Sequence, residues 1–225
     1  MPTKSPPTRE RRKPAPGPPL NRELIADAAL ELVDREGLDA LTMRRLAAEL
    51  GIGTMTIYGY FRDKEELLNL VIERTARRYE LTAGDGDWRT RLRRLIETMY
   101  RSLLEHPSTV QIRSRRPILN PGAIRACEAG MTILEDAGLE RREAAAAFRL
   151  LFTYIFGYAA FSSYEPSAEL RREWRDELSM LPPEEYPLVS GAAGELVNWM
   201  AGRKPFEAGL DLILDGIEAR IERSS

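Results

Sequence analysis

The sequence predicts an all-α protein of two parts, a small three-helix domain at the N-terminus and a larger helical domain after it. Leu, Ala, Glu and Arg dominate the 225 residues, and valine appears only five times. This composition favours helices over strands. Apolar residues recur at helical spacing through most of the chain, and no stretch shows the alternation of a half-buried strand.

The overall composition is that of an ordinary globular protein, with 43% hydrophobic and 30% charged residues, so its core needs no disulfide or metal. The single cysteine, Cys127, excludes an intramolecular disulfide and favours a reducing compartment, so we expect a cytoplasmic location. No apolar run reaches the roughly 20 residues that span a bilayer. The N-terminus also lacks the apolar stretch of a secretory signal, so we expect no membrane contact.

The first 20 residues are predicted to be a disordered tail. They hold seven of the 15 prolines and a net charge of +4, whereas the rest of the chain carries −6 and the whole chain −2. A basic tail on an acidic body is typical of proteins that contact a polyanion. A terminus that only keeps the chain soluble has the same composition, so both interpretations stay open.

Three helices are predicted in the N-terminal part. The first covers about residues 22–36, with Asn21 as N-cap and Gly37 as C-terminal stop. Two short helices follow at residues 43–50 and about 54–60, separated by a glycine turn.

Capping residues place the remaining helices. Thr42 is the N-cap of the helix at residues 43–50, Asp63 with Glu66 forms a capping box, and Asp87 is a further N-cap. The helices expected from the capping box onward cover about residues 64–80, 88–106, 109–115, 121–137, 140–163, 167–181, 189–201 and 205–223, with interruptions at 82–87 and 182–187.

The window from Leu41 to Leu68 has the packing pattern of a helix-turn-helix. A small residue, Ala47, lies where two helices cross, and Gly51 supplies the positive φ of the turn. The apolar residues that fill the space between the helices are Leu46, Leu50, Ile52 and Ile57. The second helix exposes Thr54, Met55, Thr56, Tyr58, Gly59 and Tyr60 without any carboxylate, which fits a groove lined with phosphates. A plain helical hairpin shares part of the pattern but gives no reason for exposed aromatic residues.

At these residues the chain resembles the tetracycline-repressor (TetR) family of bacterial regulators. The residues that carry the resemblance are the helix-turn-helix, Tyr58, Phe61, Lys64 and Leu67-Leu68, and more weakly residues 87–107, Arg116-Pro117 and residues 206–222. The resemblance implies an all-helical homodimer. Its helix-turn-helix domain, residues 21–66, would read the DNA major groove. Its C-terminal helical domain, residues 67–225, would serve ligand binding and dimerisation.

The resemblance also assigns DNA-binding roles, residue by residue. Thr42, Lys64 and the hydroxyl of Tyr58 would hold phosphates, Arg44, Thr54, Met55 and Thr56 would face base edges, and Tyr60 would lie at the groove wall. The chemistry agrees, because arginine bonds guanine bidentately and methionine offers an apolar surface to a thymine methyl group. Gly59 departs from the family, where a large side chain is common. A solvated helix charge is the alternative role of Arg44.

A pocket for a small-molecule effector follows from the same resemblance. Lining up the chain with the tetracycline repressors places Leu95, Met99, Ile112, Arg116, Phe148 and Phe152 at or near pocket-lining positions. The family's magnesium-binding positions fall on Gln111-Ile112 and Phe161, and apolar groups cannot hold a hard cation. The chain is therefore expected to bind no metal or other cofactor, and to take a more apolar effector with Arg116 as its polar anchor.

The homodimer has independent support in the last helix. The apolar residues there cover more than the one face that a monomer's core requires, and they are Phe206, Leu210, Leu212, Ile213, Leu214, Ile217 and Ile221. The helix at 140–163 is apolar almost all round, so we expect it to be buried and central. Its small residues Gly157, Ala159 and Ala160 allow close helix approach. Burial of the last helix within one monomer is the alternative.

Three classes of function are candidates for this sequence. The best supported is a repressor that binds a palindromic double-stranded DNA operator and is released by a small apolar or amphipathic effector. An enzyme is disfavoured, because the one Cys-His pair, Cys127 with His106, falls on different predicted helices and no phosphate loop or nucleophile elbow is present. The third is an all-helical partner-binding protein without operator binding, against which the set of Thr42, Tyr58 and Lys64 argues.

Overall fold

The computed structural model describes residues 19–77, 84–115, 121–162, 166–200 and 202–224, and all regular structure in these ranges is helical. The predicted all-α class is therefore confirmed. The described ranges leave out most of the tail at residues 1–20, the end of the helix expected at 64–80, and Arg116.

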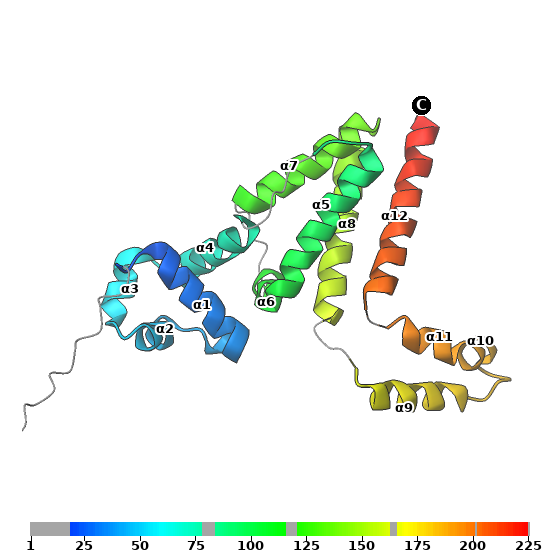
Figure 1. Ribbon diagram of the computed structural model, residues 1–225, viewed down its shortest axis with the longest axis horizontal. Coiled ribbons are helices and arrows are strands. Elements are labelled where there is room, and N and C mark those ends of the chain that lie inside the picture. Colours follow the sequence, from blue (N-terminus) through cyan, green and yellow to red (C-terminus); the bar gives the residue numbers. More distant parts are fainter. Residues whose placement is uncertain (1–18, 78–83, 116–120, 163–165, 201, 225) are drawn as a thin grey trace, which may run out of the picture.

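The N-terminal domain consists of four α-helices and one 3-10 turn (Figure 1). They are α1 (Arg22–Glu36), η1 (Leu38–Ala40), α2 (Met43–Glu49), α3 (Thr54–Tyr60) and α4 (Lys64–Arg77). The predicted caps are confirmed, because Asn21, Thr42 and Asp63 each accept a hydrogen bond from the main chain of the following turn, at 2.8, 3.0 and 2.8 Å. The 3-10 turn was not predicted.

The C-terminal domain begins with four long or medium helices and ends with a fifth long one. These are α5 (Trp88–Glu105), α6 (Pro107–Arg115), α7 (Pro121–Asp136), α8 (Arg141–Ser162) and α12 (Arg203–Ser224). Helix α6 starts two residues earlier than expected, since proline lacks an N–H and suits a first helical turn. Between α8 and α12 the chain forms α9 (Ala168–Ser179), α10 (Pro187–Gly191) and α11 (Ala193–Asn198). The helix predicted at 189–201 is thus two short helices, divided at Ala192.

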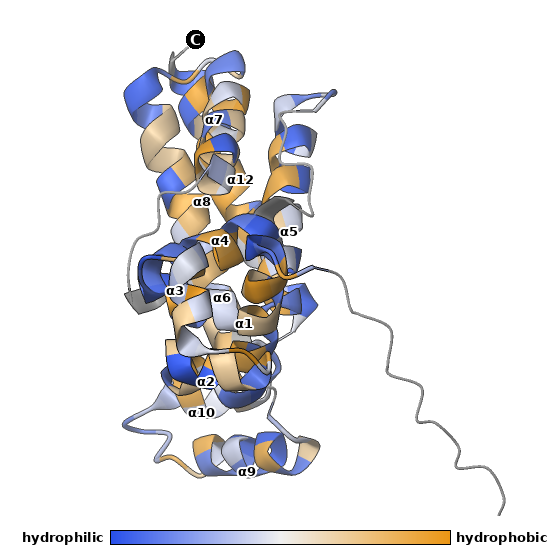
Figure 2. Cartoon of the chain, turned by 90° about the vertical axis from the view of Figure 1, so that its left-hand side faces the viewer, coloured by the Kyte–Doolittle hydropathy of each residue, from blue (hydrophilic) through white to orange (hydrophobic). Residues whose placement is uncertain are grey.

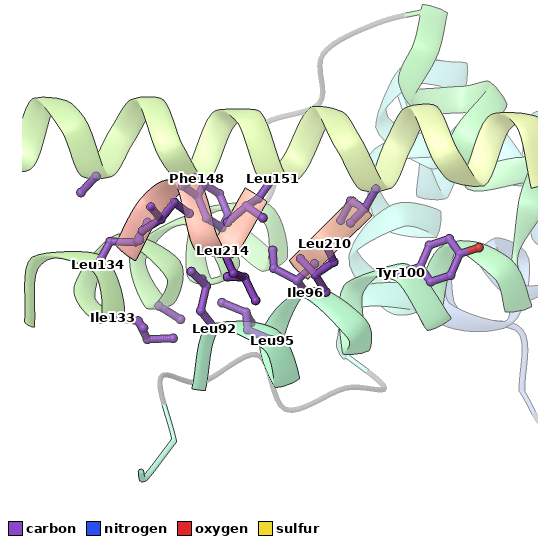
Figure 3. Packing of buried hydrophobic residues seen from close by; sticks show 14 of the residues in the cluster. Leu92, Leu95, Ile96, Tyr100, Ile133, Leu134, Phe148, Leu151, Leu210 and Leu214 are labelled. Atoms are coloured by element: carbon purple, nitrogen blue, oxygen red, sulfur yellow. The ribbon is translucent and has the colours of Figure 1, made fainter. Parts of the chain in front are cut away.

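Two apolar cores hold α1 to α8 and α12 together. The first joins α1 to α4 and includes Ile57 of α3, Phe61 and, from the C-terminal domain, Ile112 of α6. The second lies between α5, α7, α8 and α12. Figure 3 shows side chains of α5 and α8 meeting Leu210 and Leu214 of α12 in this second core. Helix α6 is therefore shared between the two domains.

Helix α8 is central but not buried on all sides, which corrects the prediction. Leu151 and Ile155 are 0% exposed, whereas Leu150 is 54% and Phe161 81% exposed. Figure 2 shows apolar residues along this helix. By length and composition alone, Arg141–Phe161 would suffice to cross a membrane. In the structure, 28% of its most apolar window is buried inside the protein. The faces of α8 that this core leaves uncovered line the cavity and the groove described below.

Candidate DNA-binding surface and effector cavity

The outward face of α3 is polar and aromatic, without an acidic residue in its first turn. Ile57, 0% exposed, anchors the opposite face in the N-terminal core. Met55 is 81% and Tyr58 47% exposed. Thr56 is exposed as well, whereas Thr54 is half-buried, which corrects its predicted exposure. In the described part of the chain, the Tyr58 hydroxyl has no hydrogen-bond partner, so it is available to an outside acceptor such as a phosphate.

The turn before α3 sets the angle of this face. Gly51 has φ 66°, the positive value that the sequence predicted. The main-chain N–H of Ile52 donates to the carbonyl oxygen of Ala47 at 3.0 Å, which closes the end of α2. Because Leu46 and Ala47 are almost fully buried, α2 and α3 pack as one unit, and the reading face of α3 has a fixed orientation on the domain.

Two neighbouring arginines of α2 differ in their partners. The Arg45 guanidinium donates to Glu49 at 2.6 Å and to Glu36 at 2.7 Å. Hydrogen bonds from Arg35 and Arg45 lower the pKa of the Glu36 carboxyl, so this network stays charged. Arg44 is exposed, and among the described residues its side chain forms no ion pair. Arg44 is therefore the arginine of this helix that an outside ligand can engage.

The remaining predicted DNA contacts have partners within the chain. Lys64 Nζ donates to the carbonyl oxygens of Leu41 at 2.5 Å and Leu38 at 3.3 Å. The Tyr60 hydroxyl donates to the carbonyl oxygen of Leu20 at 3.0 Å. Tyr60 is therefore half-buried rather than exposed, which corrects the expectation. Lys64 holds the segment that leads into Thr42, so its predicted phosphate contact stays a prediction.

A cavity of ≈ 590 Å³ opens between α6, α7 and α8. Its lining residues are Val110, Arg113, Ala123, Cys127, Met131, Ala145, Phe148, Arg149, Phe152, Thr153, Phe156, Gly157 and Ala160. A smaller space of ≈ 40 Å³ lies deeper and reaches Met99 of α5 and Thr75 of α4. Arg113, Phe152 and Phe156 line both spaces, so we call the two together the effector cavity. Its size is typical of small-molecule sites.

Three of the six predicted pocket residues line the effector cavity, namely Met99, Phe148 and Phe152. Two others do not: Leu95 is 3% exposed in the C-terminal core, and Ile112 is 2% exposed in the N-terminal core. Neighbouring positions on a helix point in different directions, so alignment with relatives does not fix which of them meets a cavity. Arg116 lies outside the described residues.

Arg113 is a cavity residue that sequence reasoning missed. Its guanidinium carbon lies 5.6 Å from the centroid of the Phe156 ring. Burial lowers the pKa of Arg113 to about 10, and no carboxylate of the described residues pairs with it. Its position directly after Ile112 could have indicated this, because consecutive residues of a helix face different surroundings and Ile112 is apolar enough to belong to a core.

The thiol of Cys127 and the imidazole of His106 do not lie together as an enzyme-like pair. Cys127 lines the effector cavity, whereas Nδ1 of His106 lies 3.6 Å from the Asp34 carboxylate of α1. Burial, with a smaller contribution from the negative charge of Glu128, raises the pKa of the Cys127 thiol, which keeps it protonated. Among the described residues, no group of three or more His, Cys, Asp or Glu has the arrangement to hold a metal ion.

The chain matches two family descriptions over most of its length. Residues 25–71 match "Bacterial regulatory proteins, tetR family" and residues 82–221 match "Tetracyclin repressor-like, C-terminal domain". The chain belongs to the TetR family. This TetR-family protein is thus a DNA-binding transcriptional regulator with a helix-turn-helix domain and a ligand-binding C-terminal domain.

Individual relatives of this TetR-family protein cover nearly the whole chain. The transcriptional repressor DrrR1 of Streptomyces coeruleorubidus is 34% identical, with 92% of this chain and 80% of that protein covered. The class D tetracycline repressor of Escherichia coli is 29% identical, with 90% and 91% covered. Among solved structures, ActR of Streptomyces coelicolor in complex with actinorhodin is 30% identical with a TM-score of 0.80, covering 91% of this chain and 99% of that one.

Proposed function

We propose that this protein is a repressor that binds a palindromic DNA operator as a homodimer and leaves it when a small amphipathic molecule enters the effector cavity. A cytoplasmic location fits this role. The observation that carries the operator-binding part is the contrast on α2 and α3, where Arg44 and the Tyr58 hydroxyl are exposed and without partners among the described residues. DrrR1 is named a repressor, and ActR has been solved with actinorhodin, which supports the same assignment.

A groove between α8 and α12 supports the homodimer. Its volume is ≈ 420 Å³ and its rim carries Leu150, 54% exposed, and Leu212, 73% exposed. Two leucines this exposed on neighbouring helices favour burial against a second copy of the chain. A two-fold dimer carries two copies of α3, so the operator half-sites would lie about 34–36 Å apart, one DNA helical turn, or a multiple of it.

Helices α4 and α6 supply a route from the cavity to the DNA-binding domain. On α6, Arg113 lines the cavity while its neighbour Ile112 is packed in the N-terminal core. On α4, Thr75 lines the deeper space. An effector that shifts either helix would change the separation of the two α3 helices in a dimer. Typical coupling between two such sites is about 1–3 kcal/mol.

The experiment that tests the function is operator binding by the chain and two matched variants. Fluorescence anisotropy with DNA from upstream of the protein's own gene should give saturable, salt-dependent binding. Arg44→Ala should lose about 1–3 kcal/mol on the operator and relax the preference at one base pair. Arg45→Ala removes the same charge from the same helix, yet its guanidinium is held by Glu36 and Glu49, so base preference should stay unchanged.

The outcomes separate the two candidate functions. If no upstream or genomic fragment binds specifically, the partner-binding alternative replaces the repressor. If Arg44→Ala weakens operator and random DNA equally, then Arg44 contacts phosphate and does not read a base. Tyr58→Phe should weaken both DNAs alike, because the hydroxyl is assigned to the DNA backbone.

A further inference from the structure

The lining of the effector cavity has an unbalanced charge. Two arginines, Arg113 of α6 and Arg149 of α8, lie among its residues, and none of the described residues that line its two spaces is an aspartate or glutamate. The other lining side chains are apolar, aromatic or small hydroxyl-bearing groups. A ligand that fills this space therefore meets positive charge and apolar surface together.

The two arginines lie next to a pair of aromatic rings. The guanidinium carbon of Arg149 is 5.7 Å from the ring centroid of Phe152, and that of Arg113 is 5.6 Å from the centroid of Phe156. The two rings are 4.6 Å apart between centroids and tilted by 31°. Flat aromatic surface and guanidinium groups thus meet at one place in the cavity, an arrangement that suits a planar ring with an attached anionic group.

Two other arginines of the chain have acidic partners, which Arg113 lacks among the described residues. On α7, Arg125 pairs with Glu73 at 3.3 Å, and on α4 Arg74 pairs with Asp27 at 2.7 Å. Arg113 has no such partner in the described part of the chain, and burial lowers its pKa to about 10. It still carries its charge at neutral pH. A desolvated cation without an anion is unfavourable, and an anionic ligand would relieve this cost.

We propose that the effector is a planar aromatic monoanion, such as an aromatic carboxylate or an ionised phenol, whose charged group pairs with Arg113 while its rings lie against Phe152 and Phe156. Arg149, which is exposed, faces the same ligand from the mouth of the cavity. That this ligand acts as an effector rests on the proposed function. That it binds in this cavity does not. The cavity of ≈ 590 Å³ has room for a fused ring system.

The test uses two fluorescent probes that differ in one group. 8-Anilino-1-naphthalenesulfonate carries an anion, and N-phenyl-1-naphthylamine has the same ring skeleton without it. Both are titrated into the full chain in the absence of DNA. Arg113→Met should weaken binding of the sulfonate about tenfold or more, since a buried charge-assisted contact is lost. Binding of the neutral probe should change less than about threefold, because methionine keeps the apolar surface.

Two further variants sharpen the result. Arg149→Met should weaken the sulfonate by only about threefold, because exposed charges are screened by water. Arg142→Met removes an exposed arginine of the same helix that lines neither space of the cavity, and should change neither probe. Equal weakening of both probes by Arg113→Met, or no saturable sulfonate binding to the unaltered chain, would overturn the proposal.

A second measurement separates ligand binding from a structural role of Arg113. If the charge serves a ligand, Arg113→Met should leave the melting temperature of the free protein unchanged or raise it, because an unpaired buried cation is replaced by an apolar chain. A clearly lower melting temperature would assign Arg113 to the fold and overturn the proposal. Operator binding by the unaltered chain is measured separately. If that binding is absent while the probes behave as stated, the repressor assignment fails but the anion site remains.

Discussion

The core around α3 and the effector cavity differ in what fills the space between their helices. In the N-terminal core, Ile57 and Phe61 are 0% and 1% exposed, and the helices close completely around them. In the C-terminal domain, Phe152 and Phe156 are only partly buried and face an open space of ≈ 590 Å³. The first arrangement gives stability and a fixed reading face, whereas the second leaves apolar surface uncovered until a ligand arrives.

The largest expected effect comes from removing one phenylalanine ring from each region. Phe61→Ala should lower the free energy of unfolding by about 3–5 kcal/mol, since a closed core cannot refill the lost volume. Phe152→Ala should lower it by about 1 kcal/mol or less, because that ring already borders a cavity and buries less surface. Urea denaturation of both variants measures the difference. Equal losses would show that the cavity is closed in solution and would erase the contrast.

The next effect compares two glycines close to the cavity. A Cβ atom on Gly130 of α7 would clash with the Phe148 ring, whereas one on Gly157 of α8 meets no atom within 4 Å. Gly130→Ala should therefore cost about 1–3 kcal/mol and push the Phe148 ring into the cavity, which weakens probe binding. Gly157→Ala should stabilise the helix by about 0.5–1 kcal/mol. If both variants gain stability, the wall at Phe148 is looser than the structure indicates.

The smallest effect is a difference in acid sensitivity. Glu66 accepts hydrogen bonds from the main-chain N–H of Arg62 at 2.9 Å and from Arg22 at 2.8 Å, and its pKa is lowered to about 2. A lowered carboxyl pKa gives stability that is present above the unfolded-state value and is lost as pH falls through the folded-state value. The melting temperature should therefore decline between about pH 4.5 and 2, and less steeply in Glu66→Gln.

The cavity should contribute nothing to that decline, because Arg113 stays protonated throughout the acid range with a pKa of about 10. Probe binding by the sulfonate, measured where the fold is intact, should accordingly stay constant from pH 7 to pH 5. A loss of binding over that interval would mean that a titrating carboxylate takes part in the cavity after all.

Most of the N-terminal domain could be predicted from the sequence because its geometry depends on single residues with strong local preferences. Asn21, Thr42 and Asp63 are caps in the structure as predicted, and Gly51 has the positive φ of the turn. The buried face of α3 followed from apolar spacing alone. Tyr60 was misplaced, because its hydroxyl bonds to Leu20, which is 40 residues away in sequence.

The effector cavity could be predicted only in part, because its shape depends on how three helices pack and on the space that their side chains leave empty. Phe148 and Phe152 were found through the resemblance. At α6, Ile112 was predicted to line the cavity, but its neighbour Arg113 does so instead. Which of these two residues faces the cavity depends on the rotation of α6 about its own axis. This helix has no strong apolar face from which that rotation could be predicted. The short 3-10 turn η1 was missed because three residues carry no periodic signal.

The position of Cys127 allows ligand binding in the effector cavity to be followed by thiol labelling of the unaltered protein. It is the one cysteine of the sequence, and it lines the effector cavity on α7. Alkylating reagents attack the thiolate form, and the raised pKa of this thiol lowers the fraction present as thiolate, which slows that reaction. A molecule that covers the sulfur should slow this labelling, so the labelling rate of the unaltered protein can report binding of compounds that have no colour or fluorescence.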